Sequence, residues 1–233
     1  MKRLLQIFLL FILVSAFFTT AFSSQALATG MNGNHSLTLG LGLSTATQSD
    51  LNSWSSAQGS GGGQLSSAYE YSLTYEYRFS STMFAFEVRP SYFTESASGG
   101  GTNTSLTGTL VYPMLRLYPL ENSFIHFFLQ AGVGWGQLSG TTTFGGNSVS
   151  YSGSAFGAIM GLGARFCFTD HQCMTIEGDA RYNLIDRSIV SSASSTSMGG
   201  LQTPVGHELE YNSNDVGNTL SGIQGILQYN LMF

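Results

Sequence analysis

Ten charged side chains have the types and the spacing to form a buried ion-pair network. They alternate with apolar or small neighbours, so each falls on one face of an extended strand. An unpaired charge is costly away from water, and the planar fork of arginine donors suits bidentate pairing with a carboxylate. The same set could instead line a narrow ion path or a switchable gate. Five of the ten are acidic and five are arginines: Glu70, Glu76, Glu87, Glu177, Asp179, Arg78, Arg89, Arg116, Arg165 and Arg181.

Two cysteines, Cys167 and Cys173, are the next candidates for chemistry. They flank a short turn, and in an oxidising compartment such a pair forms a disulfide that pins a hairpin. Two alternatives stay open at this point, namely two free thiols or a metal pair completed by His171. We expect the disulfide, no metal site and no cofactor.

The compartment follows from the first 28 residues, which predict a secretory signal peptide. Lys2 and Arg3 precede an apolar run over residues 4–18, and residues 26–28 form a small-residue cleavage site. Cleavage after Ala28 leaves residues 29–233 as one domain. A membrane anchor is the alternative, but about fifteen apolar residues fall short of the roughly twenty that a spanning helix needs.

The composition after residue 28 excludes several classes of function. Six arginines, no lysine and thirteen acidic residues give a net charge of about −7, which argues against a nucleic-acid partner because phosphate binding needs a basic face. Charged residues make up 9% of the full chain, against roughly a quarter in soluble domains. The natural surroundings of such a surface are lipid. Only helices and closed barrels satisfy their backbone hydrogen bonds there.

Eight segments alternate between apolar and polar or small residues over the length that a tilted membrane strand needs. In the first, Leu37, Leu39 and Leu41 share one face. We therefore expect an all-β fold, an eight-stranded antiparallel up-and-down transmembrane β-barrel, with the charged set facing inward. A lumen this narrow holds only side chains or one small ligand, which favours a plugged interior. The segments are residues 35–46, 67–79, 83–93, 106–118, 124–138, 155–168, 173–185 and 219–233.

Two features of this pattern are irregular. The apolar parity shifts near Pro113, which predicts a bulge or an edge irregularity at that residue. Residues 188–216 contain the segment 207–211, which could extend strands beyond the membrane. Ten strands therefore remain an alternative to eight.

The connections alternate between short and long, which predicts an orientation. Short turns at residues 80–82, 119–123 and 169–172 are expected in the periplasm together with both chain ends. The long connections are rich in Gly, Ser, Thr and Asn, a composition that we expect to be flexible and poorly packed. They are exterior loops over residues 47–66, 94–104, 139–153 and 188–216.

With these elements placed, the chain resembles the small bacterial outer-membrane β-barrel family, the OmpA/OmpX/OmpW-like group. Residues 226–233 have apolar residues at every second position and a terminal Phe. They are similar to the family's assembly signal, here Tyr229, Leu231 and Phe233. The resemblance implies location in the bacterial outer membrane, with the assembly machinery, outer-membrane lipid and lipopolysaccharide as partners.

The resemblance also assigns a place to the outward aromatic side chains. They would form interfacial girdles or the lipid-facing band, and core packing in a soluble sandwich is the alternative. These residues are Tyr69, Tyr77, Phe79, Phe84, Trp135, Phe166, Phe168 and Tyr229.

The leading functional hypothesis is a structural or surface-interaction barrel whose polar loops meet an extracellular ligand. A narrow channel or transporter for small solutes is one alternative. A barrel-embedded lipid A-modifying enzyme is another, but His126 is followed by Phe127 and Phe128, so the His-x-Ser pattern of the deacylases is missing. His207 lies beside Glu208 in a serine-rich connection, where proximity is weak evidence for a triad. We expect no catalytic residues.

Overall fold

Alternation predicts strands, and the computed structural model has a strand at every one of the eight predicted segments. The structure describes residues 34–59, 63–79, 82–122 and 124–233. The predicted signal peptide, residues 1–28, lies outside the described residues.

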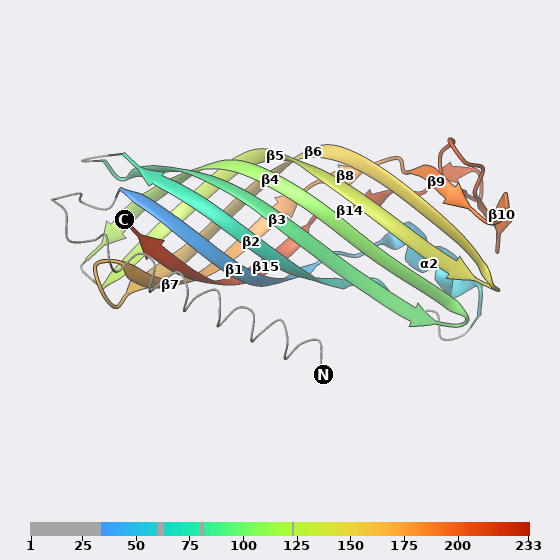
Figure 1. Cartoon of the computed structure of the whole chain (residues 1–233), viewed down its shortest axis with the longest axis horizontal. Helices are drawn as coiled ribbons and strands as arrows, with labels where there is room; N and C mark the ends of the chain where they lie inside the picture. The colour runs from blue at the N-terminus through green and yellow to red at the C-terminus, as the bar shows by residue number, and fades with distance from the viewer. Residues whose placement is uncertain (1–33, 60–62, 80–81, 123) are drawn as a thin grey trace. The chain divides into compact units, whose positions relative to one another are not determined.

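Eight antiparallel strands form a closed ring (Figure 1). The first strand, β1, pairs with the last, β15, from Ser36 opposite Met232 to Ser44 opposite Gln224. Closure leaves the ring without a free sheet edge, and it confirms the predicted eight-stranded barrel. The ring strands are β1 (His35–Thr45), β2 (Ser67–Arg78), β3 (Phe84–Gly99), β4 (Thr102–Glu121), β5 (Ile125–Phe144), β6 (Asn147–Cys167), β7 (Gln172–Tyr182) and β15 (Gly222–Met232).

The C-terminus lies at one end of the ring, which we call the proximal end, and the short helix α2 (Ser49–Ala57) lies at the other, which we call the distal end (Figure 1). The connections β4–β5 and β6–β7 are at the proximal end. The connections β3–β4 and β5–β6 are at the distal end.

Alternation places apolar side chains outside the ring and polar side chains inside it. On β1, Leu43 is 59% exposed, whereas Thr38 on the opposite face is 2% exposed. Rows of exposed large apolar side chains suit lipid rather than water. We call the outward apolar side chains of the ring the apolar band; its distal limit is marked by Leu43, Tyr69, Tyr92, Val111, Trp135, Phe156, Tyr182 and Ile223.

Strands β3 to β6 continue well beyond the apolar band. They contain 16, 20, 20 and 21 residues, against the roughly 9–11 that cross a membrane. The prediction of flexible loops over residues 94–104 and 139–153 is therefore wrong, because both segments are continuously paired hairpins. Each hairpin closes through two glycines with positive φ, as a type I′ turn requires: Gly100, Gly101, Gly145 and Gly146.

The predicted bulge at Pro113 is wrong. Pro113 faces outward and pairs with Val88 of β3, and the β4–β5 register is the same on both sides of it, although the β4–β5 pairing is interrupted at Tyr112 and Pro113. The register shift between β4 and β5 lies between Leu117 and Leu120. The parity was misread because the inward side chains next to the proline, Tyr112 and Met114, are themselves apolar and buried. Alternation of apolar and polar residues cannot locate an interior that is apolar.

The long connections 47–66 and 188–216 are packed, and the prediction of poorly packed loops is wrong for them too. Helix α2 buries Leu51 and Trp54, and Trp54 Nε1 donates a hydrogen bond to Gly199 O at 2.9 Å. Within the described residues no helix is long and apolar enough to cross a membrane.

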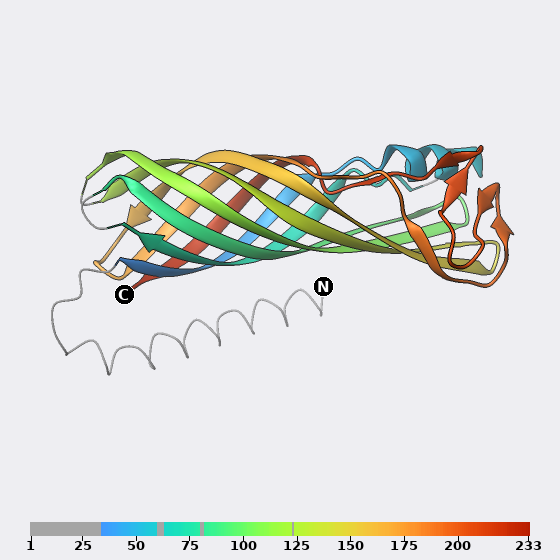
Figure 2. The ribbon, with the colours of Figure 1, turned by 90° about the horizontal axis from the view of Figure 1, so that it is seen from above.

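Short strands of the second long connection lie at the same end as α2 (Figure 2). They are β8 (Leu184–Ile185), β9 (Ile189–Ala193), β10 (Ser197–Met198), β11 (Leu201–Gln202), β12 (Glu210–Tyr211), β13 (Asn214–Asp215) and β14 (Asn218–Thr219). β9 pairs with the distal part of β6 and adds no strand to the ring. We call α2 together with residues 184–220 the distal cap.

The distal cap and the extended strands share one apolar cluster. Apolar side chains from the inner face of β3 to β6 meet those of the cap, which few charged residues interrupt. Its buried members are Ala46, Leu51, Trp54, Leu65, Ala68, Phe93, Leu106, Leu110, Tyr112, Met114, Leu138, Val149, Tyr151, Ile159, Ile185, Val190, Met198, Leu201, Leu209, Val216 and Leu220.

Candidate functional site in the barrel lumen

The inward charged side chains meet at the level of the apolar band, and Arg116 of β4 is at their centre. Its Nη1 lies 2.6 Å from Glu76 Oε2, and its Nη2 lies 2.5 Å from Glu87 Oε2 and 3.2 Å from Glu177 Oε2. The guanidinium also covers the Phe128 ring, with Cζ 4.0 Å from the centroid, a cation–π contact. One arginine thus binds carboxylates from three other strands.

Arg89 of β3 pairs with two of these carboxylates and with a third, that of Asp179. Its Nη2 lies 2.8 Å from Glu87 Oε1, and its Nη1 lies 2.5 Å from Glu177 Oε1 and 2.9 Å from Asp179 Oδ2. Because Arg89 and Arg116 share Glu87 and Glu177, these side chains form one network and not a set of separate pairs.

The strand register explains why so many donors converge on Glu76. Glu76 of β2 and Glu87 of β3 are directly opposite each other, a placement that repels unless cations intervene. Arg165 donates to both oxygens of Glu76, at 2.9 and 3.0 Å, and Tyr118 donates its hydroxyl at 2.8 Å. We call the connected set the lumen network: Glu76, Glu87, Glu177, Asp179, Arg89, Arg116 and Arg165.

Three of the ten predicted residues lie outside this network. Arg181 pairs with Glu70 at 2.8 Å, and its Nε donates to Leu220 O. Arg78 ends β2 at the proximal rim, where it binds both oxygens of Glu121 at 2.7 Å and stays partly exposed. The hydrogen bond from Arg78 lowers the pKa of the Glu121 carboxyl.

Amide side chains complete the lumen network, and the sequence analysis gave them no role. Gln130 accepts from Arg116 Nε at 3.0 Å and donates to Asp179 Oδ1 at 2.7 Å. Gln224 donates to Asp179 Oδ2 at 2.9 Å, and Gln228 lies on the same face of β15. Strand parity was the available signal, because both glutamines alternate with the outward apolar residues of the last strand.

Inward glycines on β6 make room for the network. A Cβ atom at Gly161 would overlap Asp179 Oδ1, and one at Gly163 would overlap the Phe128 ring. The smallest residue therefore stands where long side chains from neighbouring strands need space.

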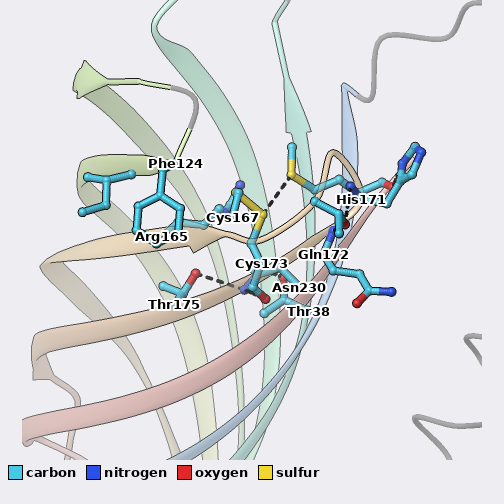
Figure 3. The surroundings of a disulfide bond; sticks show 12 residues. Thr38, Phe124, Arg165, Cys167, His171, Gln172, Cys173, Thr175 and Asn230 are labelled. Atoms are coloured by element: carbon cyan, nitrogen blue, oxygen red, sulfur yellow. Dashed lines mark hydrogen bonds between the residues drawn. A yellow bond between two sulfur atoms is a disulfide. The ribbon is translucent and has the colours of Figure 1, made fainter.

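The disulfide joins Cys167 and Cys173 across the β6–β7 hairpin at the proximal end (Figure 3). The two residues are directly opposite in the strand register. This confirms the predicted disulfide, and the alternatives of free thiols and a metal pair are wrong because both sulfurs are bonded. Cys173 Sγ also lies 3.5 Å from Met232 Sδ, and His171 Nδ1 lies 3.1 Å from Met232 O.

The three residues of the predicted assembly signal lie where β15 closes the ring. Tyr229 and Leu231 face outward beside Leu39 and Leu37 of β1. Phe233 exchanges two backbone hydrogen bonds with His35, at 2.9 and 3.1 Å. Their recognition by the assembly machinery stays a prediction.

Comparisons with known proteins identify the fold. The sequence matches the outer membrane protein beta-barrel domain over residues 14–215. No curated protein matches it. OprG of Pseudomonas aeruginosa is similar, with a TM-score of 0.51 and 10% identity over 88% of this chain and 98% of that chain.

Two further solved structures are similar. A major outer membrane protein of Thermus thermophilus has a TM-score of 0.52 and 12% identity over 85% of this chain and 99% of that chain. Ail, the attachment invasion locus protein of Yersinia pestis, has a TM-score of 0.47 and 14% identity, with 87% and 100% covered. This chain therefore belongs to the outer membrane protein β-barrel domain family, and its place is the bacterial outer membrane.

Proposed function

We propose that this chain is a closed, non-conducting outer-membrane barrel with a structural or surface-interaction role. The observation that carries the proposal is the lumen network. Its side chains come from both walls of the barrel, pair directly across the interior and are at most 3% exposed. An eight-stranded lumen has room for little else.

A second layer above the network supports the same proposal. The apolar cluster fills the interior at the distal end, and helix α2 seals it with Trp54, which packs edge-on against Phe144 at 6.0 Å between ring centroids. An ion would have to pass this apolar layer and then break the ion pairs of the lumen network. Transfer of a charge into such surroundings is unfavourable.

The proposed orientation has the distal end outside the cell and the proximal end in the periplasm. The short turns, the start of β1 and the end of β15 lie at the proximal end, which is the arrangement of outer-membrane barrels. An epitope inserted after Ser213 should be stained on intact cells, and one inserted after Asp170 only on permeabilised cells. Staining of the epitope inserted after Asp170 on intact cells would show that the orientation is the opposite of the proposed one.

The partners that we propose follow from this orientation. Outer-membrane lipid and lipopolysaccharide surround the apolar band, the assembly machinery reads Phe233, and an extracellular ligand contacts the distal cap. Replacement of residues 195–213 by a Gly-Ser linker should abolish binding to host cells or matrix and leave the ring folded. Unchanged binding would show that the ligand does not contact residues 195–213 of the distal cap.

Planar-bilayer recording tests the closed lumen. The wild-type protein should show no steady conductance. The double variant Arg89→Ala and Arg116→Ala should show brief openings, because it empties the centre of the network, and the outward control Leu115→Ala should behave as the wild type. A steady open channel in the wild type would overturn the proposal in favour of a pore.

We propose no catalytic role for the histidines. The His126 ring packs against Tyr118 at 6.3 Å between centroids at the proximal end of the lumen, far from an outer-leaflet substrate in the proposed orientation. Lipid A extracted from cells that express the protein should match lipid A from control cells by mass spectrometry. A change in acyl chain number would favour the enzyme.

A further inference from the structure

The outer face of the extended strands carries an ordered array of hydroxyl groups. Beyond the apolar band, every outward position of β3 to β6 is Ser or Thr, except for one Asn and one Gln. We call this surface the hydroxyl face: Thr94, Ser96, Ser98, Asn103, Ser105, Thr107, Thr109, Gln137, Ser139, Thr141, Thr143, Ser148, Ser150, Ser152 and Ser154.

The strand register aligns these side chains in rows across the sheet. One row runs Ser96, Ser105, Thr141 and Ser150, each directly opposite the next. A parallel row runs Thr94, Thr107, Ser139 and Ser152. Neighbours within a row are about 4.8 Å apart and neighbouring rows about 6.7 Å apart, so the face is a regular lattice of polar groups.

Many of these hydroxyls have no protein partner within the described part of the chain. Thr141 Oγ1 and Ser150 Oγ are 3.1 Å apart, and Thr143 donates to Asn103 O at 3.3 Å. Each free hydroxyl can both donate and accept. The hydroxyl side chains of this face that make no hydrogen bond to another described residue are those of Thr94, Ser96, Ser98, Ser105, Thr109, Ser139, Ser148, Ser152 and Ser154.

Exposure to water does not explain this composition. Water-facing surfaces of soluble proteins carry roughly 25–35% charged residues, and the hydroxyl face carries none. The single arginine or lysine of the distal cap, Arg187, is 3.1 Å from Asp215 and 3.5 Å from Glu208. The surface therefore has no cation for an anionic group and suits a neutral partner rich in hydroxyls.

The hydroxyl face directly continues the apolar band along the same strands. Tyr92 is followed outward by Thr94, and Val111 is preceded outward by Thr109 on β4. On β6, Ser154 precedes Phe156 in the sequence and lies on its distal side. The face therefore meets whatever layer covers the hydrocarbon on that side of the membrane.

We infer that the hydroxyl face is a docking surface for the saccharide part of the outer-leaflet glycolipid. The acyl chains of that lipid cover the apolar band, and the neutral sugars of its saccharide part, which lie beyond the anionic groups next to the acyl chains, contact the rows of hydroxyls. Sugar hydroxyls also donate and accept, so this regular lattice can match several at once without charge. This inference rests on the proposed orientation, which the epitope experiment tests separately.

Native mass spectrometry of the full chain in mixed nanodiscs tests the inference. The probes are lipopolysaccharide that carries its core sugars and lipid A that lacks them. The wild type should bind the core-bearing glycolipid at least tenfold more tightly than lipid A. The face variant, with Ser105→Ala, Thr107→Val, Ser139→Ala, Thr141→Val, Ser150→Ala and Ser152→Ala, should lose that preference.

The control variant Ser53→Ala and Ser66→Ala removes exposed hydroxyls of the same end that lie off the face, and it should keep the preference. Heat-modified mobility on gels shows that each variant is folded. Equal binding of both lipids by the wild type, or wild-type preference in the folded face variant, would overturn the inference. Efficient disulfide dimers of Ser105→Cys in native membranes would also overturn it, because a second copy would then cover the face.

Discussion

The interior of this barrel is filled by opposite chemistry at its two levels. At the level of the apolar band the lumen holds the lumen network of paired charges, and from the distal part of the band outward it holds an apolar cluster with the distal cap. The comparison shows which face of a strand is apolar in each environment. Lipid outside the wall draws them outward and leaves polar groups within, whereas a polar exterior drives them inward as in a soluble protein.

The two levels are therefore held by different forces. The lumen network depends on complete pairing, because each charge is buried and its removal leaves partners unmatched. The distal cap depends on burial of apolar area. Substitutions that test one level should leave the other intact.

The largest effect is expected for Arg116→Ala at the lower level. It leaves Glu76, Glu87 and Glu177 with one cation fewer, and loss of one partner from a buried ion pair costs about 3–5 kcal/mol. Urea unfolding in phospholipid vesicles measures the change in the free energy of unfolding. The outward neighbour Leu115→Ala is the matched control, and a loss below about 1 kcal/mol for Arg116→Ala would show that the network does not hold the barrel.

Trp54→Ala is expected to weaken the upper level by about 3 kcal/mol, because it leaves a cavity in the apolar cluster and removes a hydrogen bond to Gly199. Limited proteolysis should then cut within residues 184–220 while the ring resists. Ser53→Ala, on the exposed side of the same helix, should be cut as slowly as the wild type. If the protease cuts the ring as fast as it cuts the distal cap in the Trp54→Ala variant, the two levels unfold as one cooperative unit.

Glu95 is the exception that sharpens the comparison, since it is a buried acid in the upper level. It lies beyond Tyr92 and therefore outside the apolar band, and Gln48 Nε2 donates to it at 3.2 Å. Burial raises the pKa of Glu95 to about 7, from an ordinary 4.5.

The folded state therefore holds this proton more tightly than the unfolded chain. The free energy of unfolding should fall by about 2 kcal/mol as the pH rises from about 4.5 to about 7. Glu95→Gln should remove this fall, as measured by urea unfolding at several pH values. If the free energy of unfolding depends on pH equally in the wild type and in the Glu95→Gln variant, Glu95 is not the source of the fall.

The smallest effect is expected for the double variant Cys167→Ser and Cys173→Ser. The disulfide closes a short loop whose strands already pair, so its loss should cost about 1–2 kcal/mol. Unfolding in the presence and absence of a reductant measures it, and the reductant should not affect the variant. A loss as large as that of Arg116→Ala would mean that the proximal hairpin positions the network.

Strict alternation was sufficient to predict the ring, because a wall between lipid and a polar interior imposes period two on every strand. It failed at Pro113 and in the segments 94–104 and 139–153. At Pro113 the inner neighbours Tyr112 and Met114 are apolar. In the two segments the outer side chains are Ser, Thr and Asn and the inner ones mix apolar, glycine and polar residues, so composition imitated a loop. The Gly-Gly pairs were the signal for hairpins that composition concealed.

The candidate site divides in the same way. Parity placed all ten charged residues on the inner face, but it could not separate Arg78, which ends β2 and reaches Glu121 at the rim. Nor could it find that Gln130 links Arg116 to Asp179. Those contacts depend on strand stagger around the closed ring, which brings together residues far apart in the sequence.

The sequence by itself predicted the export signal and determined the eight strands, the inward face and the cysteine pair, because each is a local pattern of residue types. Only the tertiary structure decided which charges share partners, that α2 and residues 184–220 pack as a cap, and that scattered Ser and Thr residues form one face. Pairing partners and packed surfaces are set by the register and closure of the sheet, and no local pattern encodes these.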